Sequence, residues 1–409
     1  MPPGADDSAP PIQPGPLPPA AASSAPLQHQ GAVIPQPPGG AGPPTPNAIQ
    51  QAPNAVSPAP AAAAATPTTS VVGWVDGPAS PNNTLPRFGI SGADLGILWD
   101  NGQTGTNDQV LIAFGDTFGD CSVAGQQWRS NTMFRSGDRN LSSGISVPDP
   151  MFGNIYAGSP VTAAAPNFSK QIIDSLNLVS TEVTIIPTAA ISVGSTQYIN
   201  FMSIKKWGSP GHWTTNFSAI ATSTDNGENW TANKSTVRPS SFFDVPGIGF
   251  KWGDQYFQQG AYVQNGGYVY SFGTPSGRSG SAFLSRVAPN SLLDLSQYDY
   301  WGRKGWVHGD PSAAVEVIKA PVSEMSVQWN NYLQKYLVLY TNGSNNVVMR
   351  TATDPQGPWS TEQTLVTSTQ IPGGIYAPFI HPWSSGQDLY FDLSLWSAYA
   401  VMLMHTMLP

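Results

Sequence analysis

The stretch Ser223-Thr224-Asp225-Asn226-Gly227-Glu228-Asn229-Trp230 fits the pattern S-x-D-x-G-x-x-W. The side chains of Ser223 and Asp225 can hydrogen-bond to backbone groups of a tight turn. Gly227 can adopt the positive φ that such a turn requires, and Trp230 places a large apolar ring beside it. The pattern therefore predicts a β-hairpin turn in which Asp225 has a structural role rather than a catalytic one.

Around this turn, one unit recurs five times after residue 70: a short strand, a turn and a strongly apolar second strand. Short runs of β-branched and aromatic residues alternate with clusters of Gly, Asn, Ser and Pro, and helical periodicity is hard to find. Several short strands repeated at intervals of roughly 50 to 90 residues are typical of a β-propeller. We therefore predict an all-β, five-bladed β-propeller over residues 70–409. Its paired segments are 91–100 with 109–118, 181–191 with 197–204, 256–265 with 268–275, 323–330 with 335–342, and 376–383 with 388–396.

Residues 1–69 have a different composition, dominated by Pro, Ala, Gly, Ser and Gln. No aromatic residue precedes Trp74, whereas all 13 Trp, 14 Tyr and 16 Phe lie from there onward. Such a segment cannot bury enough apolar surface to offset the entropy of ordering it. We predict a disordered Pro/Ala-rich arm over residues 1–69 that acts as a spacer.

Charge and cysteine content exclude several classes of partner and site. The formal net charge is −8 and no basic cluster exceeds Lys205-Lys206, which argues against a nucleic-acid surface. No apolar run approaches 18 residues, so we predict no membrane span. The single Cys121 excludes an internal disulfide and a cysteine zinc cluster. The histidines lack ligand spacing, and we expect neither a metal site nor a cofactor. Low charge with many aromatic, Asn, Ser and Thr side chains suits a surface that binds sugars.

Carboxylates fall on the strands that should line the funnel of the propeller. The first strand of each blade faces the central axis, so side chains from different blades converge there. Asp94, Glu182 and Glu324 belong to three of the five predicted inner strands, and Asp116 ends a second strand in FGDTFGD. A group of carboxyl groups in a funnel indicates general acid/base chemistry. Hydrolysis of a glycosidic bond needs two of them, one as acid and one as base or nucleophile.

Structural roles remain open for the same acids. Asp116 can cap its turn, and Asp94 can bond to the backbone of the first blade. Glu324 can pair with an arginine such as Arg350. The candidate catalytic residues are Asp94, Asp116 and Glu324. We expect eight further residues to contact a sugar by stacking or hydrogen bonding: Arg129, Asn131, Glu182, Trp207, Trp213, Asn216, Gln259 and Trp329. For Arg129, a structural salt bridge is an equal alternative.

Several of these segments resemble an actinobacterial family of endo-D-arabinanases, whose domain was long catalogued as of unknown function. The resemblance runs through GADLGILW, LIAFGDTFGD, WRSNTMFRS, VTIIPTAAI, the tract from Phe201 to Trp230, and SEMSVQWNNYLQKYLVLY. It implies a five-bladed propeller that cuts inside α-linked D-arabinofuranose chains of arabinogalactan and lipoarabinomannan. The key aspartates of that family correspond to Asp94 in GADLG and Asp116 in FGDTF, with Glu324 in SEMSVQW as a third candidate.

We expect a monomeric enzyme whose partner is the D-arabinan polysaccharide. Its location should be secreted or in the cell envelope, although the opening MPPGADDSAPP has neither the basic start nor the apolar stretch of a signal peptide. One alternative is a non-catalytic carbohydrate-binding propeller of the cell envelope. Another is a hydrolase of a different sugar, such as a sialidase or an L-arabinanase. Sialidases clamp a carboxylate with several arginines, whereas only Arg129 and Arg135 lie near the first acids.

Overall fold

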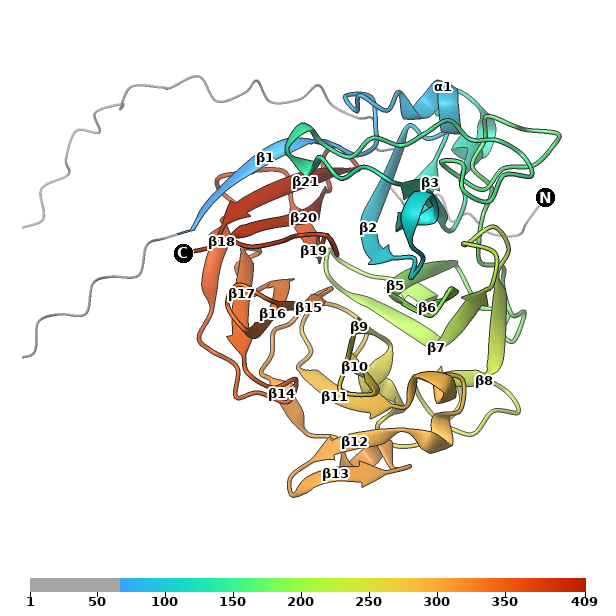
Figure 1. Ribbon diagram of the computed structural model, residues 1–409. Coiled ribbons are helices and arrows are strands. Elements are labelled where there is room, and N and C mark those ends of the chain that lie inside the picture. Colours follow the sequence, from blue (N-terminus) through green and yellow to red (C-terminus); the bar gives the residue numbers. More distant parts are fainter. Residues whose placement is uncertain (1–66) are drawn as a thin grey trace, which may run out of the picture. The chain divides into compact units, whose positions relative to one another are not determined.

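The computed structural model describes residues 67–409, which form five antiparallel sheets. The sheets stand around a common centre, with strands β2, β5, β9, β15 and β19 nearest to it (Figure 1). This arrangement confirms the predicted five-bladed β-propeller. Each predicted strand pair is present as the first two strands of a blade.

The blades follow one another in sequence, and only the last one combines strands from both ends of the described chain. Blade 1 holds β2 (Gly92–Asp100), β3 (Val110–Phe118) and β4 (Thr132–Ser136); blade 2 holds β5 (Thr184–Val193), β6 (Thr196–Trp207), β7 (Trp213–Ser223) and β8 (Thr231–Pro239). Blade 3 holds β9 (Gln259–Asn265), β10 (Tyr268–Thr274), β11 (Ala282–Val287), β12 (Asp299–Gly302), β13 (Gly305–His308) and β14 (Glu316–Ile318). Blade 4 holds β15 (Ser326–Asn330), β16 (Lys335–Thr341), β17 (Val347–Ala352) and β18 (Gln363–Val366); blade 5 holds β19 (Ile375–Ile380), β20 (Asp388–Leu395), β21 (Ala400–Met407) and β1 (Thr68–Trp74).

The ring is closed by pairing the first described strand with the last. β1 pairs antiparallel with β21, so blade 5 is completed from the other end of the chain. Asp76, two residues after the end of β1, accepts hydrogen bonds from the backbone N–H groups of Ala93 (2.7 Å) and Val401 (2.6 Å). These two bonds tie blade 1 to blade 5. Residues 1–66 of the predicted disordered arm lie outside the described residues. The arm is predicted to end at residue 69, whereas β1 already begins at Thr68.

The turn from Ser223 to Trp230 has the structure its residues predict. The Ser223 hydroxyl donates to the Asp225 carboxylate at 2.7 Å and accepts from the Gly227 N–H at 3.0 Å. Gly227 has a φ of 78°. Trp230 packs edge-on against Trp99 of blade 1, with ring centres 6.4 Å apart. Asp225 is therefore occupied by the turn, and Trp230 joins two blades.

All inner strands begin at one end of the propeller. Because each is followed by an antiparallel partner, the second strands end there too. We call this end the acid face, defined by the first residues of β2, β5, β9, β15 and β19. The small helix α1 (Thr84–Phe88) precedes β2. No helix of residues 67–409 has the length and apolarity needed to cross a membrane.

Candidate active site

Two aspartates of blade 1 lie together at the acid face. Asp94 is on β2 and Asp116 is on the neighbouring strand β3, where the register shifts on both sides of Leu95. Leu95 has a φ of 74°, and such a bulge re-aims the adjacent side chain. A Cβ atom on Gly115 would lie 2.6 Å from Asp94 Oδ1. The glycine of FGDTF therefore leaves the space that the Asp94 carboxyl group occupies beside Asp116.

Burial is the main reason why Asp94 keeps its proton. Its Oδ2 accepts a hydrogen bond of 2.9 Å from the Tyr376 hydroxyl at the start of blade 5, and its Oδ1 is buried without a protein partner. Burial raises the pKa of Asp94 to about 8, helped by the nearby charge of Asp116 and opposed by the bond from Tyr376. Burial and the neighbouring Asp94 also raise the pKa of Tyr376 far above its usual value, so the phenol remains a donor. Asp94 is thus a carboxylic acid at neutral pH.

Asp116 has a more polar environment. Its Oδ1 accepts hydrogen bonds from the indole N–H of Trp128 (2.9 Å) and the hydroxyl of Thr184 in blade 2 (2.7 Å). Burial raises the pKa of Asp116 to about 6, and these two bonds limit the rise. At pH 7 Asp116 is therefore mainly ionised while its neighbour Asp94 is protonated. Two carboxyl groups whose environments separate their pKa values can serve as an acid and a base.

Glu324 reaches the same neighbourhood from blade 4 but is paired with an arginine. Arg278 Nε and a terminal nitrogen donate to the two carboxylate oxygens at 2.9 and 2.8 Å. The guanidinium also lies over the rings of Tyr376 (4.5 Å) and Trp213 (5.7 Å). The charge of Glu324 raises the pKa of Asp94 and that of Arg278 lowers it, both to a smaller extent than burial. The alternative partner suggested by the sequence, Arg350, donates instead to the Tyr340 hydroxyl (2.8 Å) and the Glu362 carboxylate (3.1 Å).

Four of the predicted sugar-contacting residues lie at the acid-face end of blade 2. Trp207 ends β6 with 43% of its surface exposed, and Trp213 begins β7 with 8% exposed. Their rings meet edge to face at 5.9 Å. Glu182 accepts from the Ser203 hydroxyl at 2.6 Å, and Asn216 donates to the same hydroxyl at 3.1 Å. Glu182 and Asn216 thus join the start of blade 2 through Ser203, whereas Trp213 lies under the Arg278 guanidinium.

Arg129 and Asn131 are committed to backbone groups. Arg129 donates to the carbonyls of Ser169 (2.9 Å) and Gly89 (2.6 Å), and its guanidinium lies over the ring of Phe168. Asn131 is fully buried, accepts from two backbone N–H groups and donates to two carbonyls. Both side chains therefore bind the long segment 137–183 to blade 1. Among the described residues, no side-chain hydrogen bond joins either of them to Asp94 or Asp116.

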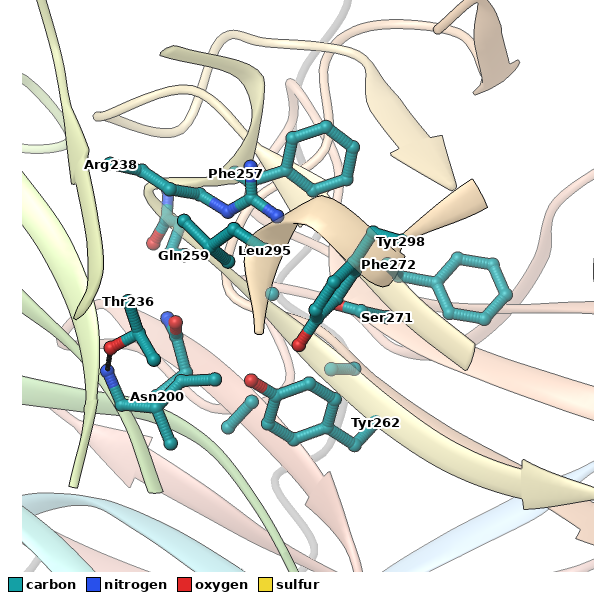
Figure 2. A pocket seen from close by; sticks show the side chains of 14 residues that line it. Asn200, Thr236, Arg238, Phe257, Gln259, Tyr262, Ser271, Phe272, Leu295 and Tyr298 are labelled. Atoms are coloured by element: carbon teal, nitrogen blue, oxygen red, sulfur yellow. Dashed lines mark hydrogen bonds between the residues drawn. The ribbon is translucent and has the colours of Figure 1, made fainter. Parts of the chain in front are cut away.

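Gln259 and Trp329 occupy different ends of their blades. Gln259 is the first residue of β9, at the acid face, and its side-chain amide donates to the carbonyls of Pro275 (3.0 Å) and Gly277 (2.6 Å), next to Arg278. Gln259 is buried and lines a cavity of about 20 Å³ between blades 2 and 3, across which the phenol groups of Tyr262 and Tyr298 point toward each other (Figure 2). That volume suits about one water molecule and is too small for a sugar. Trp329 is near the end of β15, so the length of the strand separates it from the acid face. Its indole N–H donates to Asn331.

The site includes residues that the sequence did not single out, chiefly Tyr376, Arg278, Trp128 and Thr184. For Tyr376 alone the sequence offered a signal: a tyrosine opens most of the second strands, and Tyr376 opens the first strand segment of the fifth blade in the same way. Within residues 67–409 no three His, Cys, Asp or Glu side chains are grouped as metal ligands. The arrangement supplies one proton donor, one carboxylate and a nearby aromatic wall.

Comparison with known proteins gives one family and several similar proteins. The model of the family described as domain of unknown function DUF4185 matches residues 79–405. Notoamide biosynthesis cluster protein J from Aspergillus sp. (strain MF297-2) is 28% identical over 324 residues, which are 76% of this chain and 81% of that protein. A solved structure from Bacteroides ovatus ATCC 8483 has a TM-score of 0.51 and 14% identity, covering 80% of this chain and 88% of that chain. The catalytic domain of an α-L-arabinofuranosidase from Coprinopsis cinerea has a TM-score of 0.45 and 12% identity, covering 83% of this chain and 97% of that chain.

Proposed function

We propose that this protein, which belongs to the DUF4185 family, is a glycoside hydrolase that cuts inside α-linked D-arabinofuranose chains. The description of that family assigns no activity. The observation that carries the proposal is the pair Asp94 and Asp116 at one face of the propeller, with pKa values of about 8 and about 6. The substrate rests on the resemblance to endo-D-arabinanases, which spans most of the propeller sequence. The corresponding polymers are arabinogalactan and lipoarabinomannan, and the protein would act on them as a secreted or envelope-associated monomer.

In this mechanism the two aspartates act on opposite sides of the scissile bond. Asp94, which holds its proton at neutral pH, protonates the departing glycosidic oxygen. Asp116 acts as the base or the nucleophile. Trp128 and Thr184 both bond to Oδ1 of Asp116, and no described residue donates to Oδ2, which is left for water or the anomeric carbon. Tyr376 holds the Asp94 carboxyl group in place.

The activity is tested by incubating the purified protein with arabinogalactan and lipoarabinomannan and analysing released oligosaccharides. We expect a ladder of arabinose oligosaccharides, as an endo-acting enzyme produces. An L-arabinan and a sialylated glycan, in the same panel, test the other sugar classes. Binding of D-arabinan with no product after a day would instead identify a carbohydrate-binding protein without catalysis.

We expect kcat/KM to depend on pH as a bell with its maximum near neutrality. The rate rises with pH through about 6 as Asp116 ionises and falls through about 8 as Asp94 loses the proton it must donate. The two limbs belong to the interacting pair as a whole. Initial rates on a soluble arabinan at pH 4–10 measure the profile, and thermal unfolding at each pH shows that the protein stays folded. A rate that keeps rising above pH 9 would contradict the assignment of Asp94 as acid.

Glu324 and Arg278 should move the basic limb in opposite directions. The Glu324 charge raises the pKa of Asp94 and the Arg278 charge lowers it, both after burial, which is the largest cause. Glu324→Gln is therefore expected to shift the basic limb to lower pH, and Arg278→Gln to higher pH. Equal loss of kcat at every pH, with no shift of the limb, would make Glu324 a directly reacting group instead.

A further inference from the structure

The segment between β8 and η4 (Asp254–Phe257) carries an unusual concentration of exposed aromatic rings. Phe242 is 56% exposed, Phe243 is 96% exposed and Trp252 is 63% exposed. A cluster of large, solvent-exposed apolar side chains on one short segment indicates a binding surface for a ligand or a partner.

These rings are held in fixed positions. Phe242, Phe250 and Trp252 pack on one another with ring centres 4.7, 5.8 and 5.6 Å apart, at angles between 58° and 77°. The segment is anchored from below because Val245 is buried and Ile248 packs against the same core cluster. Its rings are therefore ordered before any ligand arrives, which limits the entropy cost of binding.

The segment is joined to the end of β6 that lies at the acid face. Asp244 pairs with Lys205 at 2.7 Å, and Trp207 follows two residues later on the same strand. From Trp207, contacts continue through Trp213 at 5.9 Å to the guanidinium of Arg278. Arg278 lies over Tyr376, which bonds to Asp94. A continuous series of contacts thus links the exposed rings to the proposed acid.

We propose that an aromatic rim, formed by Trp207, Phe242, Phe250 and Trp252, binds the polysaccharide chain several sugars away from the bond that is cut. The inference rests on the proposed function and adds a second binding site for the same neutral polymer. Aromatic faces pack on the C–H faces of sugar rings, and Trp and Phe offer a large contact area without charge. The segment 240–253 carries one basic residue, Lys251, and one acidic residue, Asp244, and Asp244 is paired with Lys205 beside Trp207. Together with the net charge of −8 of the chain, this balance disfavours an anionic membrane or nucleic acid as the occupant.

The double variant Phe242→Ala/Trp252→Ala tests the rim. Binding is measured by affinity electrophoresis in gels containing arabinogalactan, and separately with a short arabinose oligosaccharide by calorimetry, on proteins that carry Asp116→Asn to prevent cleavage. Loss of two ring contacts should weaken binding of the polymer about tenfold, with less than twofold change for the short oligosaccharide. Tyr332→Ala is the matched control, because Tyr332 is also an exposed aromatic residue but lies in the β15–β16 turn, away from the acid face.

The outcomes separate the rim from the activity. Unchanged polymer binding by the double variant overturns the rim, even if the wild type cleaves arabinan. Polymer binding that the double variant loses, with no cleavage by the wild type, supports the rim as a sugar site and overturns the hydrolase. Equal loss of binding in Tyr332→Ala, or no binding of arabinan by any variant, also overturns the rim.

Discussion

Asp116→Asn is expected to lower kcat on arabinan by about 10³-fold or more without unfolding the propeller, because the amide can act neither as a base nor as a nucleophile. The amide keeps the shape of the side chain and can still accept from Trp128 and Thr184 at Oδ1. Replacing a buried carboxyl group whose pKa is raised also removes a charge that burial disfavours. The thermal unfolding temperature should therefore be unchanged or higher.

Asp94→Asn should lose a similar factor on arabinan but differ in its response to the leaving group. An aryl arabinofuranoside with an acidic phenol needs no proton donor, so this substrate should restore much of the rate in Asp94→Asn and little in Asp116→Asn. Asp120→Asn is the matched control, because Asp120 is an exposed carboxylate four residues after Asp116 that bonds only to nearby groups of its own turn. Wild-type activity in Asp116→Asn, or the same loss in Asp120→Asn, would contradict the mechanism.

The parts of the site that the sequence could predict are those made within one blade. Asp94 and Asp116 lie on consecutive strands, so the apolar pattern that located the strands also placed the acids side by side. Tyr376 and Arg278 could not be placed in this way, since they come from blades 5 and 3 and reach Asp94 only when the ring closes. That closure depends on pairing β1 with β21, a contact between segments more than 300 residues apart.

Composition also gave no means of telling a sugar ligand from a structural anchor. Arg129 and Asn131 follow FGDTF closely and have the polar groups that a sugar site needs. Their bonds instead go to the backbone of distant segments, such as Ser169 and Ile185, whose positions no local pattern reveals. Buried polar side chains are generally satisfied by such bonds. Trp207 remains accessible to a ligand, whereas Asn131 is fully enclosed.

Because buried polar side chains are satisfied by bonds to distant segments, removing one of them should lower the stability of the fold. We expect a large loss at Arg135, which bonds to none of the residues around Asp94. Arg135 on β4 is fully buried and makes three bonds of 2.9 Å, to the carbonyls of Asn226 and Ala157 and to the carboxylate of Glu228. It thereby joins the turn of blade 2 to the segment 137–183 beside blade 1. Arg135→Met leaves two buried carbonyls and the Glu228 charge without this partner, so we expect the free energy of unfolding to fall by about 3–5 kcal/mol.

Chemical denaturation of Arg135→Met and two companions measures this effect. Arg135→Lys should recover only part of the loss, because one ammonium group cannot reproduce the spread of a guanidinium over three acceptors. Arg303→Met, at an exposed turn between β12 and β13, should change stability by no more than about 0.5 kcal/mol. Hydrolysis by Arg135→Met below its unfolding transition should match the wild type, since Arg135 bonds to none of the residues around Asp94. A wild-type denaturation midpoint for Arg135→Met would show that these three bonds contribute little to the fold, and that the blade 1–blade 2 junction is held mainly by apolar contacts such as Trp99 on Trp230.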